Sequence, residues 1–307
     1  MQTQLNKKLA QLLNESNKVT DKVLKGYEKQ LIDNYKSVLS QIKDEVLWLY
    51  EKMGGNPSFQ DANRYNRLSQ LEKQIAEAVK NVNGKNIKLT TDAIKDTFED
   101  SYYQTGYAFE QGLGAKLGVN ALTYEVINAS VINPLDRITW IDRSKGWGKK
   151  LTQEISDTLT QGLIKGDTYS TVARELGNKV NIDLGRAMRI VRTEAGRAQS
   201  AASKLSTDKA MQSAERLGIK MERKWLSILD SSTRHDHRYM NGKTADKEGL
   251  YTFPNGAKTK GPRLSGIAKE DINCRCTEIT EIVSMPKKYQ PKEDFGSFTD
   301  WKATRAK

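Results

Sequence analysis

The sequence predicts a mainly helical α+β protein, with an elongated helical body that starts with a long N-terminal helix and a small, loop-rich β module near the C-terminus. Three observations predict this class. Apolar residues recur at helical spacing through much of residues 24–216, whereas residues 219–284 show strand-like alternation and turns rich in Gly and Pro. A charged fraction of 29% and a mean hydropathy of −0.69 also fit exposed long helices better than one large core.

A long apolar stripe defines the N-terminal helix. Its members step by three or four positions, which is the period of an amphipathic α-helix. They are Leu24, Tyr27, Leu31, Tyr35, Val38, Ile42, Val46, Leu49 and Met53. The sequence Gly54-Gly55-Asn56-Pro57 predicts the end of this helix. A helix of about 30 residues is about 45 Å long, so we expect it to pack on another long helix of the same chain or of a second copy.

Further helices and two strands follow along the chain. Helices are predicted from Ser58 to about Val82, with a break at Asn83-Gly84, and then from a cap at residues 90–92 to residues 112–114. Later helical patterns cover residues 147–165, 168–177 and 183–216. Strands are expected at residues 220–229 and 276–283, where polarity alternates.

These patterns predict three regions. They are a helical N-terminal region at 1–145, a domain at 146–284 that combines helices at 147–216 with the β module at 219–284, and a polar, basic, mobile tail at 285–307.

The charge balance points to an anionic partner. Fifty Lys and Arg residues against 38 Asp and Glu residues give a formal net charge of +12, which favours an anionic partner, nucleic acid first. The basic residues are spread along the chain rather than gathered in one block, so a plain basic surface remains the alternative.

Membrane and secretory classes are not expected. No apolar run approaches the roughly 18 residues that a spanning helix needs, and no apolar segment follows the first eight residues. Two cysteines cannot build a disulfide framework. We therefore expect assembly in a reducing cytoplasm.

Both histidines and both cysteines of the chain lie within a window of 42 residues. Each pair has the spacing i, i+2, so on extended backbone both members of a pair point the same way. His235 and His237 facing Cys274 and Cys276 would supply four tetrahedral ligands for a structural zinc ion, with no open position. Buried thiols with exposed histidines, or a disulfide, are the alternatives.

A second dense stretch contains Arg192, Thr193 and Glu194. Glu194 with Arg197, three residues on, is either an ordinary surface pair or part of a buried anchor that joins the helix to the β module. The same residues also suggest an ADP-ribosyltransferase, although the Glu-x-Glu or Gln-x-Glu pair of those enzymes is missing. The carboxylates Asp230 and Asp236 beside the two histidines suggest a metal-dependent nuclease, but no second carboxylate cluster supports that reading.

An ordered set of short motifs joins these features. The set is Arg192-Thr193-Glu194, Trp225, Leu229-Asp230-Ser231-Ser232-Thr233-Arg234, His237, Asn241-Gly242-Lys243, Phe253-Pro254 and Asn273-Cys274-Arg275-Cys276. It resembles the C-terminal domain of the minor capsid, or head morphogenesis, proteins of tailed bacteriophages, the phage Mu protein F-like family. The resemblance covers roughly residues 145–284, about half of the chain.

The resemblance implies a virion component that is incorporated with the portal protein during procapsid assembly, and that in some phages contacts DNA and affects its delivery. We therefore expect assembly in the host cytoplasm and a final place inside the capsid. Arg192, Thr193 and Glu194 match the Arg-Thr-Glu of the family, and His237 with the Cys-x-Cys matches its His and Cys positions. His235 matches no position of the motif. The resemblance implies no catalytic residue, so we expect no enzyme.

Overall fold

The computed structural model describes residues 1–55 and 57–306, and it confirms the predicted class: 67% of the chain is helical. The longer helices are α1 (Gln2–Lys52), α3 (Arg67–Leu113), α5 (Trp140–Lys165) and α6 (Tyr169–Arg216). The shorter ones are α2 (Phe59–Asn63), α4 (Tyr124–Val131), α7 (His235–Met240), α8 (Ala268–Asp271) and α9 (Phe298–Arg305). A 3-10 turn, Arg64–Asn66, precedes α3. Within the described part of the chain, no helix is both long and apolar enough to cross a membrane.

Four strands form two small antiparallel sheets among the described residues. Strand β1 (Lys220–Leu226) pairs with β4 (Thr277–Ser284), and β2 (Tyr251–Thr252) pairs with β3 (Lys258–Thr259). In the larger sheet Trp225 lies opposite Glu278. A bulge between Lys220 and Met221 shifts the register at the start of β1.

The chain divides into two compact units. The first contains residues 1–25, 92–137 and 192–307, and the second contains residues 26–91 and 138–191. Helices α1, α3 and α6 contribute residues to both. The boundaries predicted at residues 145 and 284 remain a prediction.

The apolar stripe predicted for α1 is largely buried in the core of the second unit. Six members of the stripe are buried, namely Leu31, Tyr35, Val38, Ile42, Val46 and Leu49. Two polar contacts, the first buried and the second partly buried, accompany this core. The hydroxyl of Tyr35 donates to Asp183 Oδ2 at 2.7 Å, and Ser144 Oγ donates to Asn83 Oδ1 at 2.8 Å.

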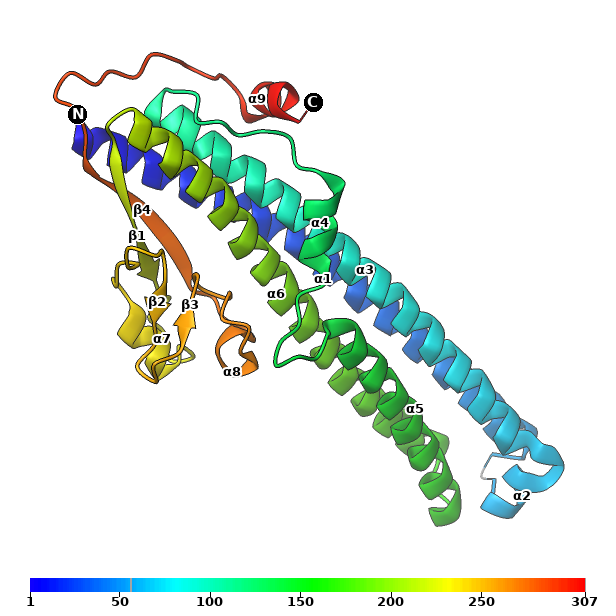
Figure 1. Cartoon of the computed structure of the whole chain (residues 1–307). Coiled ribbons are helices and arrows are strands. Elements are labelled where there is room, and N and C mark those ends of the chain that lie inside the picture. Colours follow the sequence, from blue (N-terminus) through cyan, green and yellow to red (C-terminus); the bar gives the residue numbers. More distant parts are fainter. Residues whose placement is uncertain (56, 307) are drawn as a thin grey trace. The chain divides into compact units, whose positions relative to one another are not determined.

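The first unit packs the larger sheet against helices. One apolar cluster contains Leu5 and Leu9 of α1, Phe109 of α3, Met221 of β1 and Ile282 of β4, all buried. Figure 1 shows β1 and β4 running alongside the C-terminal half of α6. The start of α1 also covers the sheet edge, since Ile282 donates its backbone N–H to Asn6 Oδ1 at 2.8 Å. The sheet that leads into the β module is therefore fixed on the helices at one end.

Several predicted helix limits were wrong. Helix α1 begins at Gln2 rather than at Leu24, α3 continues through Asn83-Gly84, and α6 joins the two segments predicted at 168–177 and 183–216. Packing on both sides of a weak position sustains a helix that local propensity alone would interrupt. Within the predicted turn at residues 54–57, Gly54 and Gly55 have positive φ, while Asn56 lies outside the described residues.

The C-terminal tail was predicted to be mobile, but it is packed. Trp301 of α9 is buried and donates its indole N–H to Glu110 Oε2 at 2.7 Å. Arg305 Nη2 donates to the same oxygen at 2.8 Å. Gly114 accepts backbone hydrogen bonds from Lys292 and Glu293. An apolar anchor and a buried carboxylate therefore hold a tail whose composition is polar.

Candidate metal centre and its anchor

The β module has a small core of its own, built around Trp225. The buried members of this core are Trp225, Met240, Tyr251, Phe253, Cys274 and Cys276. The Trp225 ring meets the edge of His237 with ring centroids 5.7 Å apart. Its indole N–H donates to Ser227 Oγ, and Ser227 Oγ donates to the backbone oxygen of His237 at 2.6 Å. These contacts hold α7 against β1.

Three of the four predicted metal ligands come together in this core. His237 Nδ1 lies 3.5 Å from Cys274 Sγ and 3.4 Å from Cys276 Sγ. The three potential ligand atoms lie within 4.8 Å of one another, and all three residues are buried. The cysteines are free thiols, so no disulfide joins them. This group could bind a metal ion.

His235 lies outside the group, which corrects the predicted four-ligand set. Its side chain is 92% exposed and lies 3.6 Å from Asp236. The prediction assumed extended backbone, on which residues i and i+2 share a face. Both histidines instead lie on α7. On a helix, residues i and i+2 are about 200° apart around the axis, so His237 points inward and His235 points to solvent.

Glu270 completes the surroundings of the histidine. Its Oε2 lies 3.1 Å from His237 Nε2, and its side chain is 1% exposed. A carboxylate at this distance favours the tautomer with the proton on Nε2, which leaves the Nδ1 lone pair directed at the two sulfurs. Sequence reasoning missed Glu270, because nothing in Lys269-Glu270-Asp271 distinguishes it from an ordinary charged turn.

The ionisation of the group favours a thiolate. The pKa of Cys276 is lowered, first by the hydrogen bond from Cys274 and then by its contact with His237, and these effects together exceed the opposing effect of burial. The pKa of Cys274 is raised, because it donates to Cys276 and is itself buried. Burial alone would lower the pKa of His237, but contacts with Cys276 and Glu270 raise it overall. A thiolate is the form of cysteine that binds metals.

The Arg-Thr-Glu motif lies on α6 and faces the loop that carries the cysteines. Thr193 Oγ1 accepts the backbone N–H of Asn273 at 3.2 Å. Glu194 Oε2 accepts a hydrogen bond from Arg197 Nη1 at 2.8 Å, and both side chains are buried. Burial excludes the surface-pair interpretation. Arg192, by contrast, is exposed.

Arg197 extends this buried network. Its Nη1 also donates to the backbone oxygen of Asn133 at 2.5 Å, and its Nε lies 3.6 Å from Asp271 Oδ2. Asp271 in turn accepts the backbone N–H of Gly266 at 2.9 Å. Arg263 crosses in the other direction, from the loop to α6, and donates to Cys274 O at 2.8 Å and to Gln199 Oε1 at 2.7 Å. Sequence reasoning missed Asp271 and Arg263.

The Asp-Ser-Ser-Thr-Arg segment braces the outside of the same loop. Asp230 accepts two hydrogen bonds from Arg275, both 2.7 Å long. Arg234 Nη2 donates to the backbone oxygen of Ile272 at 2.5 Å. Because Cys274 and Cys276 point inward while Arg275 points outward, the Cys-x-Cys alternates as extended backbone does. Asp230 is therefore held by an arginine at the surface of the module.

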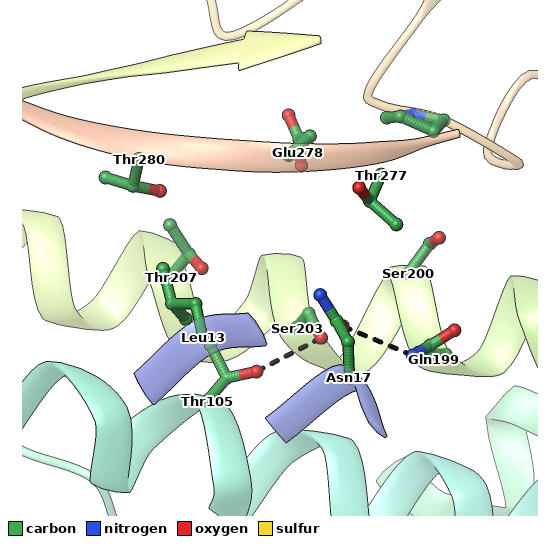
Figure 2. A pocket seen from close by; sticks show the side chains of 11 residues that line it. Leu13, Asn17, Thr105, Gln199, Ser200, Ser203, Thr207, Thr277, Glu278 and Thr280 are labelled. Carbon is green, nitrogen blue, oxygen red and sulfur yellow. Dashed lines mark hydrogen bonds between the residues drawn. The ribbon is translucent and has the colours of Figure 1, made fainter. Parts of the chain in front are cut away.

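A polar cleft lies elsewhere in the first unit, between α6 and β4 (Figure 2). Its side chains largely satisfy one another: Thr105 donates to Ser203 Oγ at 3.1 Å, and Gln199 donates to Asn17 Oδ1 at 3.3 Å. Glu278 is the one acidic side chain lining it, and it accepts the Tyr251 hydroxyl at 2.8 Å. Burial raises the pKa of Glu278.

Comparison with known proteins supports the resemblance that the motifs indicated. Residues 153–279 match the family described as phage Mu protein F like protein. Minor head protein GP7 of Bacillus phage SPP1 is 28% identical over 274 residues, which cover 87% of this chain and 86% of that protein. These two matches confirm the resemblance to the phage Mu protein F-like family, which the family match places at residues 153–279. The matched region contains the Arg-Thr-Glu motif and all three members of the His/Cys/Cys group.

A second relative has a different name. The chain is 30% identical over 285 residues, 91% of its length, to NAD(+)–arginine ADP-ribosyltransferase EFV of Enterococcus faecalis (strain ATCC 700802 / V583). The chain spans 57% of the length of that relative. No solved structure matches the chain.

Proposed function

We propose that this phage head protein is a minor component that associates with the portal protein during procapsid assembly. The observation that carries the proposal is the similarity to the SPP1 minor head protein, which extends over most of both chains. Assembly in the host cytoplasm and a final place in the capsid interior belong to the same proposal. The partner surface is not assigned to particular residues.

Two measurements test the role in assembly. Co-expression with the portal protein of the same phage should give a complex that co-purifies, and mass spectrometry of purified particles should detect the chain in few copies. The phage major capsid protein expressed without portal serves as the control and should not retain the chain. Absence from purified particles would contradict the proposal.

Contact with packaged double-stranded DNA is a further part of the proposal, and it includes an effect on DNA ejection. The support is the net charge of +12, spread along the chain without a recognition motif. Binding should be independent of sequence and should weaken steeply with salt, because counterions are released from the phosphates. Fluorescence anisotropy on two unrelated duplexes of equal length, from 50 to 300 mM salt, tests this. Equal affinity at both ends of that range would contradict it.

Self-association through the long N-terminal helices is also proposed. Its support is the length of α1, 51 residues. Light scattering of the purified chain over a hundredfold concentration range should show a rising mass. A monomer at every concentration would contradict this part alone.

We propose zinc as the ion for the His/Cys/Cys group. One imidazole nitrogen and two sulfurs form the borderline-soft donor set that zinc prefers. Tetrahedral zinc, with Zn–N of about 2.0–2.1 Å and Zn–S of about 2.3 Å, requires N···S separations of about 3.5 Å. The observed separations are 3.5 and 3.4 Å. The chain should carry one zinc per molecule, lost in a Cys274→Ser/Cys276→Ser variant, as measured by elemental analysis.

A second candidate function is a transferase or nuclease built on the His/Cys module and the Arg-Thr-Glu motif. The 30% identity to a protein named as an ADP-ribosyltransferase favours the transferase. Against it, Glu194 is paired with Arg197 and Asp230 with Arg275, so neither carboxylate is available as a base. Incubation with NAD and an arginine-rich acceptor should release no nicotinamide above background. Release that disappears in a folded Glu194→Gln variant would establish the enzyme instead.

A further inference from the structure

The loss of His235 from the ligand set changes what the metal centre can do. A four-ligand site would be closed and purely structural, whereas zinc held by three protein ligands keeps a position for water or another ligand. Within the described part of the chain, the group at this site contains His237, Cys274 and Cys276 and no fourth His, Cys, Asp or Glu. Glu270 cannot serve, because it lies on the Nε2 side of the imidazole ring, away from the sulfurs.

The space beside the three ligands is a small pocket. All three ligand residues line it, together with Thr233, Arg234 and Asn273. The guanidinium of Arg234, one of the lining groups, donates to the backbone oxygen of Ile272. The remaining lining residues are Ile228, Ser232 and Arg275. The pocket therefore adjoins the metal position with hydroxyl, amide and cationic groups rather than with a further ligand.

Glu270 suits the role of an outer carboxylate. Metal-binding histidines commonly donate their second ring N–H to a carboxylate, which fixes the ring and raises its basicity. The 3.1 Å contact between Glu270 Oε2 and His237 Nε2 has this form, and the carboxylate is buried. A buried carboxylate on that side is explained by a histidine whose other nitrogen binds a cation.

We propose that His237 Nδ1, Cys274 Sγ and Cys276 Sγ bind one zinc ion whose fourth position is open to this pocket and is occupied by an exchangeable water or small anion. The inference rests on the zinc proposed above. It does not depend on incorporation into phage heads, which is measured separately. An ion with such a position can accept a ligand from outside the module, whereas a closed site cannot.

Cobalt substitution of the full-length chain tests the open position. Co²⁺ in a tetrahedral site with two thiolates gives intense visible absorption that responds to any change of ligand. Addition of azide should shift this spectrum saturably, and zinc should displace the cobalt with loss of colour. A cobalt spectrum unchanged by azide would overturn the open position, and failure to bind either metal would overturn the site and the zinc proposal together.

Three variants identify the ligands. His235→Ala should keep one metal per chain and the azide response, because that side chain is exposed. His237→Ala should lose the metal. Glu270→Gln should still bind, with an affinity about 10- to 100-fold lower, as loss of an outer carboxylate does. Loss of metal in His235→Ala would restore the closed four-ligand site and contradict the proposal. Because Glu270→Gln preserves the shape of the side chain, the metal affinity of this variant can be measured even if His237→Ala fails to fold.

Discussion

Thr193 on α6 accepts the backbone N–H of Asn273, the residue directly before Cys274. This single hydrogen bond joins the two most distinctive motifs of the chain, Arg-Thr-Glu and Asn-Cys-Arg-Cys, across 80 residues of sequence. Asn273 has a φ of +54°, a conformation that asparagine tolerates better than most residues. The helix thus helps to fix the backbone at the point where the first cysteine enters the core.

Removing that acceptor should loosen the cysteine loop. Thr193→Val keeps the shape of the side chain but leaves the Asn273 N–H without its partner, at a cost of about 1 kcal/mol in the free energy of unfolding. Urea denaturation followed by tryptophan fluorescence measures the loss. Thr193→Ser retains the hydroxyl and is the matched control. Equal stability of the Val and Ser variants would show that the bond contributes nothing.

The buried arginine of the same network should matter more. Arg197→Met leaves the carboxylates of Glu194 and Asp271 buried without their cation, which should cost about 3–5 kcal/mol. Lys204→Met, on the same helix, breaks the pair with Asp208, which is half exposed, and should cost at most about 0.5 kcal/mol. Thermal and urea unfolding of both variants test the contrast. Similar losses in the two would argue against a buried anchor.

The ion pair of Asp230 and Arg275 predicts an acid-dependent contribution to stability. The arginine holds the pKa of Asp230 down to about 2, below its usual value of 3.8. Because the folded pKa is the lower one, the contribution is complete above about pH 5 and is lost as pH falls through about 2. Urea midpoints between pH 2 and 6 should therefore separate the wild-type chain from Asp230→Asn at the upper end and converge at the lower end. Added salt should shrink the difference, since both groups are exposed. A constant gap at every pH would exclude this ion pair as its source.

The elements that the sequence predicted correctly differ physically from those that it missed. Strand β1 was predictable because one of its faces is buried along a regular alternation, and β4 because its sequence alternates around the buried Thr280 and Ile282. The beginning of α1 was missed because its buried face carries Ser16 and Thr20, which interrupt the apolar period. Thr20 is satisfied inside by Ser16 O and Asp100 Oδ2, a pairing visible only in three dimensions.

The candidate site shows the same division. Clustering along the sequence found His237 and both cysteines, since each residue type is rare in this chain. It wrongly added His235, because α7 has only six residues and is too short to show a helical period. Glu270 could not be found, as its role arises from a loop that returns to the histidine after 33 residues.

The packed C-terminal helix should detach when its anchor is removed. Trp301→Ala deletes a buried ring and the hydrogen bond to Glu110, a change that usually costs about 3–5 kcal/mol. Because α9 follows a stretch without helix or strand at residues 285–297, we expect local detachment, seen as faster tryptic cleavage after Lys287, Lys288 and Lys292. Lys302→Ala, which removes the partly exposed ion pair with Glu99 and a cation–π contact with Tyr103, is the control and should affect cleavage far less than Trp301→Ala does. Equal cleavage rates for Trp301→Ala and wild type would contradict the anchor.

Two glycines in long helices should respond to alanine in opposite ways. Gly84 lies inside α3 with nothing within 4 Å of where a Cβ would stand, so Gly84→Ala should stabilise the fold by about 0.5–1 kcal/mol through helix propensity. Gly148 lies on α5, and a Cβ there would come within 2.6 Å of Asn83 Nδ2. Gly148→Ala should therefore destabilise, because Asn83 also accepts the hydrogen bond from Ser144 and cannot move without weakening it. Chemical denaturation of the two variants measures both effects. Destabilisation by Gly84→Ala would mean that α3 is interrupted at this position, as local propensity predicted. A neutral effect of Gly148→Ala would mean that α5 and α3 are less closely packed at Asn83.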